Sequence, residues 1–325
     1  MTSRIVATAT SNTPERRIIP GLFAQDEFQL ADRTTLLGGI RTDLHREHGV
    51  IVSPRLALKY EIDPRQTIRL NSATGFRAVN IFSEDHAAIS GFRRLVIRGP
   101  LRPERSLNAS VNYSHRVGDL ENPATFDIDL FATYFTNKIQ PDYTTDPAVT
   151  IYANLDGHAV SRGLSVSIDR TFEHIPIAAS LGATIADVYI MRSGVARAQE
   201  FSPRFTSVFA LSYTVPGANV TVDYTGRVVG PMTLPPCVDT RGVACANVPT
   251  RIPWFSEQRV QFTRTVSRGL DLIASVRNAL NVVVQRPVFD ARRPFDSDFQ
   301  TNFVYGPVEG RRVQIGARYV RARSE

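Results

Sequence analysis

Long hydrophobic runs, methionine and tryptophan are scarce in this chain of 325 residues, and each shortage narrows the class of protein. No run approaches the ~20 apolar residues of a membrane-spanning helix, which excludes a helical membrane bundle. With 42% hydrophobic and 21% charged residues, the chain is also too apolar for intrinsic disorder. Three Met and one Trp against 20 Gly and 20 Pro favour strands and turns.

Lysine is nearly absent, because Lys59 and Lys138 are the only lysines among 38 basic residues. A net charge of +7 can indicate nucleic acid or an anionic surface as the partner. The arginines are scattered along the chain rather than gathered in one helix or tail, so we expect no nucleic-acid partner. We expect them to line a polar interior or to lie in surface loops.

Motifs for catalysis and metal binding are missing as well. The sequence has no G-x-S-x-G turn, phosphate-binding loop, H-E-x-x-H pair or paired-cysteine zinc spacing. His45 and His48 flank Glu47, but in a short connection between strands this pattern favours a solvated loop over a metal pair. We therefore expect no enzyme activity, no metal site and no cofactor.

Apolar and polar residues alternate along much of the chain, with the period of two that a half-buried strand shows. In residues 105–117, one face is apolar and the other carries mostly Ser and Asn. No segment of similar length shows a helical period. The apolar face there consists of Leu107, Ala109, Val111 and Tyr113. Polar candidates for an enclosed interior are Arg69, Asn71, Arg77, Asn108, Asn112, Asp127, Asp129, Asp169, Asp223, Arg227, Asp271, Arg277 and Arg318.

The predicted strands are long. Several reach the ~9–11 residues that cross a bilayer at a tilt, beyond the ~5–6 usual in globular sheets. Tight turns and longer connections alternate between them, as in outer-membrane barrels. The sequence therefore predicts an all-β fold, an antiparallel transmembrane β-barrel segment of about 13 strands. The predicted ranges are 20–30, 33–43, 51–62, 65–77, 104–117, 124–139, 159–172, 175–192, 202–214, 218–230, 256–268, 270–284 and 309–321.

Cys237 and Cys245 are the only cysteines, and both lie in a proline-rich connection between two predicted strands. Two thiols this close in an oxidising compartment predict a disulfide that restricts the loop. The alternative is a pair of free thiols in a cytoplasmic protein, which the strand pattern disfavours.

Several segments resemble the barrel of TonB-dependent outer-membrane receptors, and they follow one another in that family's order. The segment SPRLALKYEIDPRQTIRLNSATGFRAVNIF, which begins at Ser53, resembles a strand pair that leads into a long outer loop. The resemblance extends from about Pro20 to Tyr319. The later segments are LRPERSLNASVNYSH (101–115), AVSRGLSVSI (159–168), RNALN (277–281) and VYGPVEGRRVQIGARY (304–319).

The resemblance implies a barrel of about 22 strands whose lumen is closed by a separate N-terminal plug domain. Residues 20–321 are expected to form part of that barrel, residues 1–19 a lead-in or partial strand, and residues 322–325 a tail. No plug, TonB box or signal peptide is recognisable in the sequence, so we expect the C-terminal part of a receptor. Open sheet edges in lipid cost several kcal/mol per unpaired backbone group, so we expect no insertion of this segment alone.

The resemblance also implies a function, the active import of a scarce nutrient such as a ferric siderophore or a cobalamin across the cell outer membrane of a Gram-negative bacterium. The expected partners are the TonB–ExbB–ExbD complex, acting through the plug, and outer-membrane lipid. Arginines and aromatic rings near the outer rim suit an anionic, partly aromatic iron chelate. The candidate substrate-binding residues are Arg77, Arg93, Arg94, Trp254, Arg292, Arg293 and Tyr305.

Two alternatives remain open. A passive porin or an adhesin-type barrel would have similar strands without energy coupling. An outer-membrane lipase or protease would need a nucleophile and a base clustered on the barrel, and the sequence shows no such group.

Overall fold

Strands account for all regular secondary structure in the residues that the structure, a computed structural model, describes. No helix among these residues is long and apolar enough to cross a membrane. Side chains are described from residue 18 onward, except at 94–95. The prediction of an all-β fold is confirmed. The described residues are 2–5, 13–16, 18–78, 94–118, 123–142, 145–146, 149–172, 175–237, 239, 241–246, 248–267, 269–284, 289–290, 292–293, 299 and 304–320.

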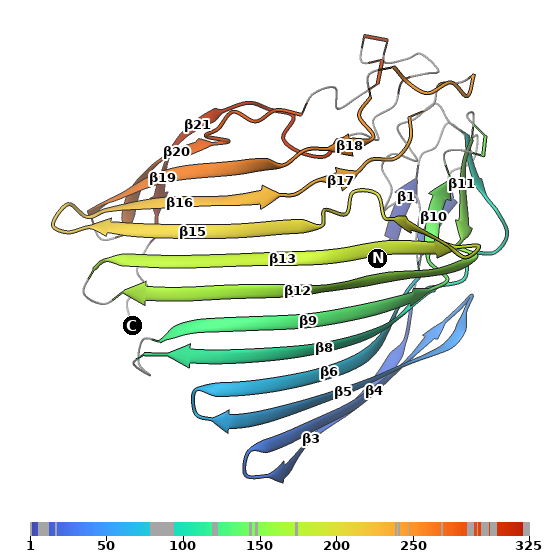
Figure 1. Ribbon diagram of the computed structural model, residues 1–325, viewed down its shortest axis with the longest axis horizontal. Coiled ribbons are helices and arrows are strands. Elements are labelled where there is room, and N and C mark those ends of the chain that lie inside the picture. The colour runs from blue at the N-terminus through green and yellow to red at the C-terminus, as the bar shows by residue number, and fades with distance from the viewer. Residues whose placement is uncertain are drawn as a thin grey trace.

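One large antiparallel sheet dominates the fold (Figure 1). Its continuous path has the order β21-β20-β19-β16-β15-β13-β12-β9-β8-β6-β5-β4-β3, and β14 pairs with β13 beside it to complete a 14-stranded sheet. The path thus contains the strands that the alternating pattern predicts. Their bounds are β3 (Gly21–Ala31), β4 (Thr34–His45), β5 (Gly49–Asp63), β6 (Gln66–Arg77), β8 (Glu104–Val117), β9 (Ala124–Thr136), β12 (Gly157–Phe172), β13 (Ile177–Arg192), β14 (Val195–Ala198), β15 (Phe205–Val215), β16 (Val220–Val229), β19 (Phe255–Ser267), β20 (Leu270–Arg277) and β21 (Arg312–Tyr319).

The long connections contain short strands of their own. β7 (Arg94–Ile97) lies in the connection after β6, and β10 (Ile139–Asp142) and β11 (Val149–Asn154) lie in the connection after β9. β7 pairs in parallel with β11, so two outer loops share one three-stranded sheet. The remaining short strands are β1 (Thr2–Ile5) paired with β2 (Thr13–Arg16), and β17 (Met232–Thr233) paired with β18 (Arg251–Ile252).

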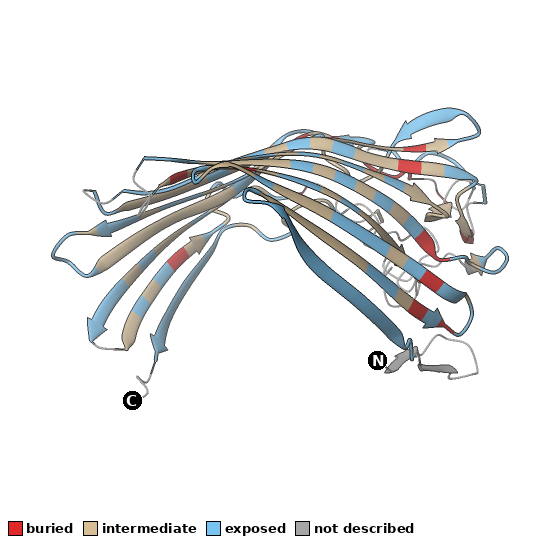
Figure 2. Cartoon of the chain, turned by 90° about the horizontal axis from the view of Figure 1, so that it is seen from below, coloured by how far each residue is buried: buried red, intermediate tan, exposed pale blue. Residues whose placement is uncertain are grey.

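The two faces of the large sheet differ as the sequence predicts. Val111 is 41% exposed and lies in register with Leu70 and Leu130, so one face carries a continuous apolar row. On the opposite face, Asn112 accepts a hydrogen bond from Arg69 at 3.1 Å and donates one to Asp129 at 3.0 Å. The sheet curves (Figure 2), and along β9 the apolar row is exposed while the polar row is half buried. The apolar face is therefore convex and the polar face concave.

Within the described residues, the sheet is an open trough rather than a closed barrel. β3 and β21 pair on one side only, and every residue of both strands is exposed. A sheet edge has unpaired backbone groups, which a hydrocarbon environment does not tolerate. The trough therefore needs further strands at both edges when it lies in a membrane.

β20 is shorter than the predicted strand 270–284, because it ends at Arg277. The next residue, Asn278, has a positive φ of 49°, which breaks the extended backbone. The side chain of Asn278 accepts a hydrogen bond from the Val282 backbone N–H at 2.9 Å and donates one to the Glu309 carbonyl at 3.0 Å. Asparagine tolerates this conformation because its amide satisfies local backbone groups.

A small hydrophobic core lies at the outer end of the sheet, which is the end that carries the long connections, next to the last residue of β16 and the first residue of β19. It consists of buried Val229, Met232, Leu234 and Ile252, against which Phe255 and Tyr305 pack. This core gives the loops on that side a fixed position relative to the strands below them.

Candidate functional site

Three arginines on the concave face lie opposite one another on three neighbouring strands. Arg259 of β19 is in register with Arg277 of β20, and Arg277 is in register with Arg312 of β21. Directly opposed residues in an antiparallel pair have Cβ atoms about 4.5–5.5 Å apart, and like charges there are destabilising. This arginine row is therefore not explained by stability, and its guanidinium groups suit carboxylate or other anionic oxygens.

The arginine row lines a pocket of about 660 Å³ at the outer end of the sheet. Arg227 adds a fourth guanidinium to the lining, while Glu257 and Glu309 supply the acidic groups. Arg227 forms an ion pair with Glu257, and Arg312 forms one with Glu309. Four arginines against two glutamates leave an excess of positive charge in a concave surface, which attracts anions.

Two members of the arginine row have no carboxylate partner in the part of the chain that the structure describes. Arg259 Nη2 donates instead to the neutral Oε1 of Gln261 at 2.6 Å. Gln261 in turn donates to Thr263 Oγ1 at 3.2 Å, and this chain of hydrogen bonds orients Arg259 along the concave face. Arg277 lies between the two other arginines, so an anion placed over it has several charged donors within reach.

An apolar cavity of about 650 Å³ adjoins this pocket, and Pro307 lines both. None of the residues that line the cavity is charged. The ring centroids of Phe255 and Tyr305 are 6.2 Å apart, and those of Trp254 and Phe205 are 5.2 Å apart. The site thus combines a cationic pocket with a neighbouring surface of aromatic and proline rings.

Trp254 and Tyr305 are the two candidate residues that the structure brings together. Both line the apolar cavity, and Trp254 is 56% exposed. Phe205, the ring partner of Trp254, belongs to the outward row, since it is in register with Ile185. Trp254 therefore lies where the cavity meets the convex face, a position that also suits an interfacial aromatic.

Arg77, the candidate at the end of β6, is tied to the sheet. Its guanidinium forms a 2.7 Å ion pair with Glu104, whose side chain is 9% exposed. Glu104 also accepts a hydrogen bond from the Ile139 backbone N–H at 2.8 Å. Burial lowers the pKa of Lys138, the residue before Ile139, whereas the negative charge of Glu104 raises it. Lys138 also donates a hydrogen bond to the side chain of Gln199. Arg77 thus joins a cluster that fastens the outer connections to the rim.

The other candidates are placed less fully. Arg293 forms an ion pair with Asp290 at 2.7 Å within its own loop, and Arg292 is exposed. Arg94 begins β7, where the backbone alone is described, and Arg93 lies outside the described residues.

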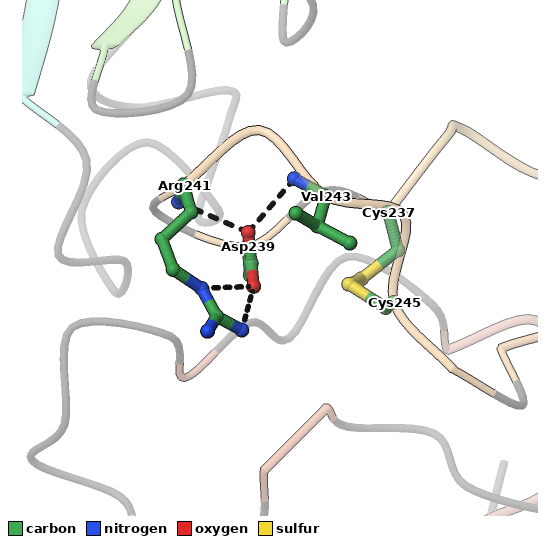
Figure 3. The surroundings of a disulfide bond; sticks show 5 residues. All are labelled: Cys237, Asp239, Arg241, Val243 and Cys245. Carbon is green, nitrogen blue, oxygen red and sulfur yellow. Dashed lines mark hydrogen bonds and ion pairs between the residues drawn. A yellow bond between two sulfur atoms is a disulfide. The ribbon is translucent and has the colours of Figure 1, made fainter.

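The loop between β17 and β18 contains a disulfide that joins Cys237 and Cys245. Figure 3 shows that the carboxylate of Asp239 accepts hydrogen bonds from the backbone N–H groups of Arg241 at 2.9 Å and Val243 at 2.8 Å. The Arg241 guanidinium also donates to Asp239 and, with these backbone groups, holds the pKa of that carboxyl below its usual range. The loop is therefore fixed by a covalent and a polar constraint.

The sequence analysis missed Arg259 and Arg312 as members of the site. It places Arg227 and Arg277 on an interior face, and the structure shows both in the pocket. Arg259 and Arg312 also occupy the polar positions of their strands, near the outer ends, so alternation combined with distance from the turn was the available signal.

The comparisons with known proteins agree with this architecture. A family model described as TonB dependent receptor-like, beta-barrel, matches residues 3–236. An iron-regulated outer membrane virulence protein of Vibrio cholerae is 31% identical over 98 residues, which cover 30% of this chain and 15% of that protein.

Solved structures resemble the fold over most of the chain. The siderophore receptor PirA from Acinetobacter baumannii has a TM-score of 0.69 at 15% identity, covering 93% of this chain and 45% of that one. A mutant of the ferric enterobactin receptor PfeA from Pseudomonas aeruginosa has a TM-score of 0.66 at 19% identity, covering 93% and 44%. The FrpB iron transporter from Neisseria meningitidis has a TM-score of 0.64 at 15% identity, covering 93% and 45%. The chain therefore spans less than half the length of these proteins.

Proposed function

This chain belongs to the TonB-dependent receptor-like β-barrel family of the outer membrane, and we propose that it forms part of the wall of a receptor for an anionic ferric chelate. The observation that carries the proposal is the arginine row beside the aromatic cavity. Ferric catecholates combine negative oxygens with flat rings, so one ligand can use both parts of the site. The names of the similar proteins, which include an iron transporter and a ferric enterobactin receptor, support the same substrate class.

Binding begins with long-range attraction. The net positive pocket is concave and flanked by apolar walls, which focus its field on approaching anions. Arg259 and Arg277 then donate charge-assisted hydrogen bonds to chelate oxygens, and Tyr305 provides a ring face for stacking in the adjoining cavity.

Transport requires parts that the described sheet does not provide. We propose that a plug domain within the completed barrel moves when the TonB–ExbB–ExbD complex pulls on it, and that this movement releases the chelate inward. The present chain then contributes wall and capture surface. A passive porin is disfavoured because the matched family is one of energy-coupled receptors, and an enzymatic role is disfavoured because that family consists of receptors.

Ligand binding by the purified full chain in detergent tests the proposal. We expect ferric enterobactin to bind, and to bind more weakly as salt is added, because salt screens the arginines. Cobalamin, which lacks the clustered negative oxygens, is the comparison ligand. Equal affinity for both ligands, or an affinity for the chelate that is unchanged by salt, contradicts the assignment to anionic chelates.

A further inference from the structure

Charged side chains are rare on the convex face, so the few that occur are informative. The strand register places Arg162 of β12 on this face. Arg162 lies opposite Ala132 of β9, which faces the same side as Leu130 two residues away, and opposite Asp187 of β13. Among the described strands of the large sheet, the charged outward positions are Asp26, Asp63, Arg105, Arg162, Arg170, Asp187 and Arg264.

Arg162 lies at the outer boundary of the apolar band. About ten residues separate it from Phe172 at the turn end of β12, and at ~3.3 Å per residue with a tilt of ~45° they span about 23 Å. The apolar band of an outer-membrane barrel is ~25 Å tall. The Arg162 guanidinium also lies 5.6 Å from the centroid of the Tyr189 ring, and tyrosine is typical of the interface. Arg162 is therefore at the level of the lipid headgroups.

A groove of about 940 Å³ extends from this level down the convex face. Side chains from β6, β8, β9, β12 and β13 form its apolar wall, and Arg162, Asp187 and Arg204 supply its charged groups. The main apolar residues are Leu70, Val111, Leu130, Leu164 and Ile185.

The charges in this groove do not cancel. Arg162 forms a 3.1 Å ion pair with Asp187, yet its side chain remains 60% exposed. Arg204 is exposed, and its backbone is held beside β13 because the Ala186 N–H donates to its carbonyl at 3.0 Å. Among the described residues, no carboxylate pairs with Arg204. One net positive charge at headgroup level above an apolar groove matches an amphiphile with an anionic head.

We propose that this groove, the wall groove, binds an outer-leaflet lipid with a phosphate-bearing headgroup. The phosphate receives hydrogen bonds from Arg162 and Arg204, and an acyl chain lies along the apolar wall. The site is on the opposite face of the sheet from the arginine row, so the inference does not depend on which nutrient the receptor carries.

Native mass spectrometry of the full chain in detergent tests the proposal, with phosphatidylglycerol and phosphatidylcholine of identical acyl chains as probes. We expect phosphatidylglycerol to be retained, and more than about tenfold more weakly by the Arg162→Gln/Arg204→Gln variant, because it loses two charge-assisted hydrogen bonds and one such bond alone corresponds to roughly tenfold (~1.4 kcal/mol) or more. The Arg162→Lys/Arg204→Lys variant should restore much of the binding. Unchanged retention in the glutamine variant overturns the proposal.

The matched control is Arg170→Gln/Arg264→Gln, which removes two outward arginines at the turn end of the strands and should leave retention unchanged. Equal losses in the two glutamine variants indicate general electrostatics and contradict a specific site. Equal retention of phosphatidylcholine also contradicts it. Competition by inorganic phosphate alone assigns the arginines to free phosphate and overturns the lipid assignment.

Discussion

Arg259 and Arg277 face each other directly across β19 and β20 on the concave face. Replacing Arg277 by Gln removes a like-charge contact, so we expect the free energy of unfolding to rise by about 0.2–1 kcal/mol. The same change should weaken ferric enterobactin binding by about tenfold, because a charge-assisted hydrogen bond is lost. Denaturation and ligand titration on the same preparations measure the two effects.

The control for this prediction is Arg69→Gln. Arg69 also faces the concave side, but it belongs to β6 and donates to Asn112 at 3.1 Å, away from the arginine row. If Arg277 has a structural role instead, Arg277→Gln lowers both the free energy of unfolding and the affinity for the ligand. That result contradicts the arginine row as a ligand site.

Val111 and Asn112 are adjacent in β8 but face opposite sides of the sheet. Val111→Arg places a charge in lipid, and we expect it to impair membrane insertion by about 2–4 kcal/mol if the residue lies near the midplane. Asn112→Arg should be milder, because the new side chain enters the polar interior. Folding yields in lipid vesicles, measured on a closed barrel that contains this chain, compare the two, and similar losses for both substitutions contradict the assigned facing.

The Cys237–Cys245 disulfide closes a short loop beside the small outer core. Replacing both cysteines by Ser should destabilise this loop by about 2–3 kcal/mol while leaving the strands intact, since the constraint acts on a short closed segment. Hydrogen exchange measures this directly. Faster exchange should be confined to the amides between Met232 and Ile252, and faster exchange across β16 or β19 is inconsistent with a local role.

Asp239 makes the order of this loop depend on pH. Hydrogen bonds from Arg241 and the backbone of Val243 lower its pKa, so the folded loop favours the charged carboxylate. The stabilisation is complete above the ordinary carboxyl pKa and is lost as pH falls through the depressed one. We expect the amides of Arg241 and Val243 to stay protected near neutral pH and to lose protection in strong acid. Asp239→Asn should remove this pH dependence, and a titration that is unchanged in this variant assigns it to another group.

Alternation in the sequence predicts most strand positions well, and its errors have local or long-range causes. β20 ends early because Asn278 adopts a positive φ that its own amide stabilises, which a count of apolar and polar residues does not detect. The parallel pairing of β7 with β11 joins two separate connections, so no local pattern indicates it. The substrate-binding roles proposed for Trp254 and Tyr305 stay predictions, although both residues line one cavity.

By itself, the sequence determined which side of the sheet each strand residue faces, because successive side chains of a strand point to opposite sides. It also determined the membrane-crossing length of the strands. Only the tertiary structure decided that Arg259, Arg277 and Arg312 form one row, because the register of β20 against β21 depends on the long connection between them. The position of the wall groove has the same origin, since it depends on how five strands with separate sequence patterns are aligned.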